Sequence, residues 1–124
     1  MRLVSTYLRA RVLARLLVGF AIVLAALAAP RPARADEAAA RAHFKKGIEL
    51  YDKKRFADAL TAFQAAYAEK PSAGIKQNIA LSLQGMGRFV EAAAAFDEAL
   101  EEGKETLKPE TRAAIERELA ELSK

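Results

Sequence analysis

Apolar residues recur every three or four positions along most of the chain after residue 36, with short polar segments between them. This spacing puts apolar side chains on one face of an α-helix. The predicted helices span residues 37–53, 57–69, 75–86, 89–100 and about 109–123. We therefore expect an all-α protein.

Proline and glycine mark several of the expected helix ends. Pro71 and Gly103 follow the second and fourth helices, where a helix commonly terminates. Pro109 suits the first turn of the last helix, because an N–H at that position would have no partner within the helix. The apolar residues of this last helix share one face and charged residues occupy the others, which is typical of a capping helix.

The first 35 residues differ in composition from the rest of the chain. They hold six Arg and no acidic residue, and an apolar run of 14 residues extends from Leu16 to Ala29. Such a segment, followed by the small-x-small sequence Ala33-Arg34-Ala35, is typical of a cleavable signal peptide that is itself helical. The run is shorter than the roughly 20 residues that a membrane-spanning helix needs. We predict cleavage after Ala35, with a retained membrane anchor as the alternative.

The net charge of +4 of the whole chain comes from this leader. Residues 36–124 hold 14 Lys and Arg against 16 Asp and Glu, a net charge of −2, so nucleic-acid binding is not expected. The chain has no Cys, which excludes disulfides, thiolate metal sites and the acylated Cys of a lipoprotein. We expect an exported protein, periplasmic or secreted, that contacts a membrane only through the leader before cleavage.

Two segments of the chain match at an offset of 33 residues. Residues 55–66 and 88–99 are identical at six of twelve positions, including an Arg-Phe pair and a second Phe. A period between about 20 and 50 residues indicates an array of stacked structural repeats. We predict one domain over residues 36–124, in which two helical hairpins, about 40–73 and 74–104, precede the capping helix.

The hairpins resemble tetratricopeptide repeats. Gly47 and Ala80 supply the small residue of the first helix, and Ala-x-x-x-Phe begins at Ala59 and at Ala92. The resemblance covers about residues 40–104 and implies two antiparallel helix-turn-helix repeats, whose first helices line a concave groove for a peptide or a partner helix. By family register, the groove residues are Phe44, Lys45, Ile48, Tyr51, Gln77, Asn78, Leu81 and Gln84.

Within this set, Phe44, Ile48 and Tyr51 form an apolar stripe wider than one neighbouring helix can cover. The stripe either binds a partner or packs under the following helix. Chaperone-binding members of the family hold a C-terminal carboxylate with Lys and Asn in the groove. Because Phe44 and Ile48 replace two of those residues, we do not expect that clamp.

The sequence offers no scaffold for catalysis, a metal site or a cofactor. His43 is the only histidine and has no second ligand nearby, so we interpret it as a packing residue. The expected function is a non-enzymatic scaffold that binds another protein or peptide. The alternative is a self-associating structural subunit of a cell-envelope assembly, because two repeats fall short of the three or more usually needed for independent stability.

Overall fold

The fold was obtained as a computed structural model that describes residues 33–124. The predicted leader therefore lies outside the described residues, apart from positions 33–35. Ala33–Lys124 form one compact unit. Its helices are α2 (Ala33–Asp52), α3 (Phe56–Glu69), α4 (Ala73–Gly85), α5 (Phe89–Glu102) and α6 (Pro109–Leu122). The all-α prediction is confirmed, since this part of the chain contains five helices and no strand.

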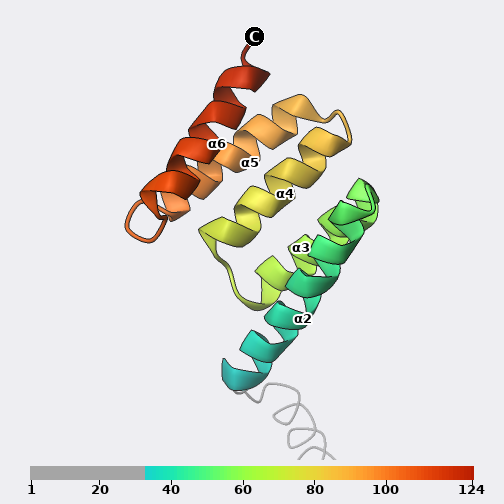
Figure 1. The fold of residues 1–124 in the computed structure, drawn as a ribbon. Coiled ribbons are helices and arrows are strands. Elements are labelled where there is room, and N and C mark those ends of the chain that lie inside the picture. Colours follow the sequence, from blue (N-terminus) through green and yellow to red (C-terminus); the bar gives the residue numbers. More distant parts are fainter. Residues whose placement is uncertain (1–32) are drawn as a thin grey trace, which may run out of the picture. The chain divides into compact units, whose positions relative to one another are not determined.

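Successive helices alternate in direction and form two layers (Figure 1). In this view α2, α4 and α6 lie in the front layer, and α3 and α5 lie behind them. Each helix packs against the next one in the sequence, so α3 joins α2 to α4 and α5 joins α4 to α6. The unit is thus built from two hairpins, α2–α3 and α4–α5, followed by the single helix α6.

The turns within the two hairpins share one backbone geometry. Lys54 and Gly87, which are 33 residues apart, have positive φ angles of 58° and 75°. Arg55 and Arg88 follow them as N-caps, both with φ −86° and ψ 64°. In both turns the arginine N–H donates to a leucine carbonyl five residues earlier, at 2.9 Å. The 33-residue offset of the sequence is therefore repeated in the backbone.

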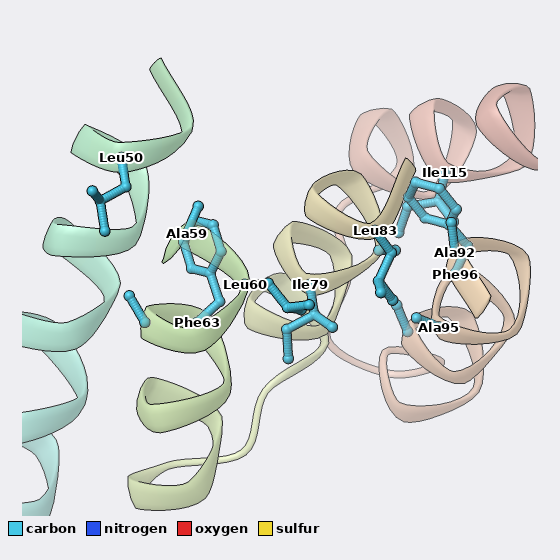
Figure 2. Packing of buried hydrophobic residues seen from close by; sticks show 13 residues of the cluster. Leu50, Ala59, Leu60, Phe63, Ile79, Leu83, Ala92, Ala95, Phe96 and Ile115 are labelled. Carbon is cyan, nitrogen blue, oxygen red and sulfur yellow. The ribbon is translucent and has the colours of Figure 1, made fainter. Parts of the chain in front are cut away.

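Two phenylalanines at equivalent positions form the centre of the core. Phe63 of α3 and Phe96 of α5 are fully buried, and many of the other buried core residues are alanines. Phe63 faces α2, whereas Phe96 lies beside Ile115 of α6 (Figure 2). Alanine-rich helix faces allow the helices to approach closely, so that one large ring fills the space between them.

Gly47 of α2 lies directly against the ring of Phe63 in α3. A Cβ atom at Gly47 would lie 2.5 Å from the ring of Phe63, which is too close for any side chain. Phe44, one helical turn earlier, contacts the same ring with a centroid separation of 5.6 Å. The glycine therefore makes room for the aromatic pair that fastens α2 to α3.

Lys76 of α4 lies in a polar cluster that joins the two hairpins. Its Nζ is 2.8 Å from Glu98 Oε2, 3.8 Å from Glu102 Oε1 and 4.2 Å from the centroid of the Tyr67 ring. The Tyr67 hydroxyl in turn donates a hydrogen bond to Glu102. Side chains from α3, α4 and α5 thus meet around one cation, which sits over an aromatic face.

Alkaline pH is expected to weaken this cluster. The hydrogen bond to Glu102, and then burial, raises the pKa of Tyr67 above its ordinary value of 10.0. Burial disfavours the charge of Lys76, but the hydrogen bond to Glu98 and the neighbouring groups outweigh it, so the Lys76 pKa is also raised. A raised folded-state pKa gives stabilisation that is complete below the unfolded-state value and is lost as the pH rises through the folded-state value.

The urea midpoint of unfolding should therefore fall as the pH rises above about 10. The variant Tyr67→Phe should show a shallower fall, because one of the titrating groups is gone. Urea titrations between neutral pH and about pH 11 measure both slopes. Equal slopes in the wild type and the variant would contradict a role for Tyr67 in this dependence.

Candidate functional site

An open cavity of about 670 Å³ lies between the first halves of α2 and α4 and the start of α6. It is of the size that proteins use for ligands and for the side chains of bound peptides. The principal wall residues are Glu37, Arg41 and Phe44 of α2, Ile75 and Gln77 of α4, and Leu107 and Lys108 before α6. The cavity thus collects residues from three helices of the front layer.

The floor of the cavity is apolar and fixed by the core. Phe44, Ile75 and Leu107 are half-buried and pack against the buried cluster. Leu107 rests on Gly103, where a Cβ atom would come within 2.3 Å of it. Because these side chains pack against the core, the floor is preorganised and needs no ligand to form.

The loop between α5 and α6 is held by hydrogen bonds. The N–H of Leu107 donates to the carbonyl of Gly103 at 2.9 Å. The Arg112 guanidinium donates to the carbonyls of Gly103 and Lys104 at 3.2 and 3.1 Å. These contacts set the position of Lys108, the N-cap of α6, at the edge of the cavity.

The rim of the cavity carries three cations and one carboxylate. Glu37 is 2.8 Å from Arg41 and 3.5 Å from Lys70, and Lys108 lines the same cavity. The charge of Lys70, followed by that of Arg41, lowers the pKa of Glu37 below its usual value. The rim is therefore positive at neutral pH, although residues 36–124 together carry a net charge of −2.

The N-terminus of α4 adds to this positive character. The first turns of α4 and α6 both contribute residues to the cavity wall. The first turn of α4 contains no acidic residue, and its N-cap Ser72 accepts a hydrogen bond from the Ile75 N–H at 3.3 Å. Because the N-terminal end of a helix carries partial positive charge, the start of α4 favours a negative group at this end of the unit, whereas α6 already carries Glu110 in its first turn.

Three of the eight predicted groove residues lie in the cavity wall, namely Phe44, Gln77 and Asn78. The side-chain amide of Asn78 donates to the Gly74 carbonyl at 2.8 Å, so one of its donors is already used. Phe44 serves both as floor of the cavity and as a packing partner of Phe63. Phe44 therefore packs under the following helix, as one of the two alternatives predicted, and also lines the cavity.

The other five predicted residues lie outside the cavity wall. Ile48, Tyr51 and Leu81 are half-buried against the core, and Lys45 is exposed. Tyr51 stands edge-on to Phe56 of α3, with ring centroids 5.2 Å apart. Burial, and then the charge of Glu118, raises the pKa of Tyr51. Gln84 donates to Glu118 of α6 at 2.8 Å, which ties α4 to the capping helix.

Sequence reasoning missed Glu37, Arg41, Lys70 and Lys108, and with them the charge of the rim. The family register pointed only to a few positions of the first helix of each hairpin. Arg41 and Glu37 lie one and two helical turns before that set on α2, whereas Lys70 and Lys108 come from helix ends. The one local signal of a positive rim was the start of α4, whose first turn contains no acidic residue.

His43 is exposed on α2, so its interpretation as a packing residue is wrong. Within residues 33–124, no three His, Cys, Asp or Glu side chains are grouped so that they could hold a metal ion. None of the helices in the same range has the length and apolar character needed to cross a membrane. No protein-family model, curated protein or solved structure matches the chain.

Proposed function

We propose that this protein is an exported scaffold of tetratricopeptide type that binds a peptide or a partner helix between α2, α4 and α6. The observation that carries the proposal is the open cavity with its apolar floor, formed by Phe44, Ile75 and Leu107. A concave site with an ordered apolar floor and a polar rim is suited to holding a segment of another chain.

Export and a non-catalytic role belong to the same proposal. The basic, apolar leader and its small-x-small site support cleavage after Ala35, within the first turn of α2, and a periplasmic or secreted location. The residue inventory, with one His and no Cys, supports a binding protein that uses no cofactor. The partner is another protein or peptide rather than a nucleic acid.

The test uses a substitution that fills the cavity without disturbing the core. Gly74 lines the cavity, and a Cβ atom added there meets nothing within 4 Å. Peptides selected from a display library on the unit Ala33–Lys124 should bind the wild type and the control Gly74→Ala, but should bind Gly74→Trp at least about tenfold more weakly. Fluorescence anisotropy measures the affinities. Equal binding to all three proteins would place the site elsewhere.

A self-associating structural subunit is the second candidate, and one observation favours it. Met86, Phe89 and Val90 at the turn between α4 and α5 are 39, 54 and 85% exposed, which leaves an apolar patch in contact with water. At the equivalent place in the first hairpin, Phe56 is half-buried against Gly85, where a Cβ atom would lie 2.7 Å from its ring. The second hairpin lacks this cover.

Sedimentation equilibrium tests the self-association. If the patch forms an interface, the wild type sediments as an oligomer and the double variant Phe89→Ser, Val90→Ser sediments as a monomer. Both side chains are exposed, so the variant should keep its fold, which circular dichroism checks. A wild-type protein that remains monomeric at millimolar concentration would remove this candidate.

A further inference from the structure

The charges around the cavity indicate which kind of segment it accepts. Resting on the proposed function, we infer that the occupant is an extended segment in which acidic side chains flank an apolar one. The apolar side chain would lie on the floor formed by Phe44, Ile75 and Leu107. Its acidic neighbours would meet the cations of the rim, Arg41, Lys70 and Lys108.

The cations are accessible to such a ligand. The side chains of Arg41 and Lys70 are 80 and 57% exposed, and both are held near the opening by Glu37. Among the described residues, Lys108 has no ion-pair partner. One ligand carboxylate could therefore pair with Lys108 without displacing another group. A second ligand carboxylate could replace Glu37 as the partner of Arg41 and Lys70.

An apolar side chain on the floor strengthens these pairs. When it covers Phe44 and Leu107, it also excludes water from the adjacent rim, and the Coulombic attraction between opposite charges at a partly exposed rim is stronger where less water surrounds them. Polar side chains of Gln77, Thr106 and Thr111 lie in the same wall. They offer hydrogen bonds to the unpaired backbone of an extended segment, whereas a helix satisfies its own backbone groups.

The chain's own leader is a poor occupant. Residues 1–35 hold six Arg and no acidic residue, so their charge has the same sign as that of the rim. A segment of opposite charge is attracted and steered to the cavity instead. The charge complementarity therefore favours an acidic segment of a partner protein.

Glu37 competes with an acidic ligand for Arg41 and Lys70. Its carboxylate already contacts both Arg41 and Lys70, and an acidic ligand must displace it from them. Replacing Glu37 by Gln frees the two cations and removes a repelling charge. The structure thus predicts a variant that binds an acidic ligand more tightly than the wild type does.

The experiment measures binding of an acetylated and amidated peptide that carries one leucine flanked on each side by two glutamates. A neutral control peptide has glutamines in place of the glutamates. A third peptide has the acidic sequence with a free C-terminal carboxylate. With Ala33–Lys124 in low salt, we expect the acidic peptide to bind at least about fivefold more tightly than the neutral one, with the free carboxylate adding less than about twofold. Glu37→Gln should tighten binding of the acidic peptide by about threefold.

Matched charge variants locate the effect. The double variant Lys70→Gln, Lys108→Gln should bind the acidic peptide about fivefold more weakly than the wild type does. The control is the double variant Lys53→Gln, Lys104→Gln, which lowers the net charge by the same amount outside the cavity wall. Its affinity should change by less than about twofold. Raising the salt concentration to about 0.5 M should weaken binding of the acidic peptide and leave binding of the neutral peptide nearly unchanged.

The outcomes separate this inference from the function on which it rests. If both peptides bind equally, Gly74→Trp blocks both and Glu37→Gln has no effect, the cavity binds peptides and the acidic preference is wrong. If the free C-terminal carboxylate dominates the affinity, the flanking acidic side chains are not the determinant and the inference also fails. If no peptide binds, including those from the display library, the proposed function fails as well.

Discussion

The variant Phe63→Ala is expected to lose about 3–5 kcal/mol of its free energy of unfolding. The ring of Phe63 is fully buried and fills the contact between α2 and α3. Its removal leaves a cavity that Gly47, directly opposite, has no side chain to fill. Because a domain of this size has a total stability of only about 5–15 kcal/mol, this single change should remove a large share of it.

Urea denaturation followed by circular dichroism measures the loss, and Phe89→Ala is the matched control. Phe89 is also an aromatic residue at a helix position, but it is 54% exposed, so its truncation should cost less than about 1 kcal/mol. Phe96→Ala should behave like Phe63→Ala, because Phe96 is equally buried at the equivalent position. Similar small losses at Phe63 and Phe89 would contradict the described core.

A chain that ends at Lys108, and so lacks α6, is expected to unfold or aggregate. Ile115 of α6 is fully buried, and Leu119 and Leu122 pack against the same cluster. Without them one side of Phe96 would meet water. Burial of each such side chain contributes about 1.5–3 kcal/mol, so the loss approaches the total stability of the unit.

Thermal unfolding and light scattering test this expectation. The control is a chain that ends at Leu122, which lacks two residues but keeps the whole of α6. It should melt cooperatively, close to the full-length unit. If the chain without α6 also melts cooperatively and at a similar temperature, α6 is an accessory and not part of the core.

The helices were predictable from the sequence because their signals are local. Apolar spacing, Pro109 and the glycine in the second turn placed four of the five helix starts and all five helix ends to within about two residues. The start of α2 was placed too late, at residue 37 rather than Ala33. Sequence reasoning stopped at the cleavage motif, although Ala33-Arg34-Ala35 also consists of good helix formers.

The cavity was predictable only in part because it depends on tertiary contacts. Phe44 and Gln77 occupy the inner face of successive hairpins, which the 33-residue repeat indicates. Leu107 and Lys108 enter the wall because Gly103 lets Leu107 approach and Arg112 holds the loop. No periodicity in the sequence reveals those contacts, and so the charge of the rim stayed hidden.

The matching turns have a consequence for how the protein can change in length. Each hairpin closes its turn and caps its second helix with its own residues, from Lys54 to Arg55 in one and from Gly87 to Arg88 in the other. A third copy of the 33-residue unit, spliced between α3 and α4, would therefore inherit a complete turn. Gene duplication or protein engineering could lengthen the row of hairpins in this way while α6 continued to cover the last one.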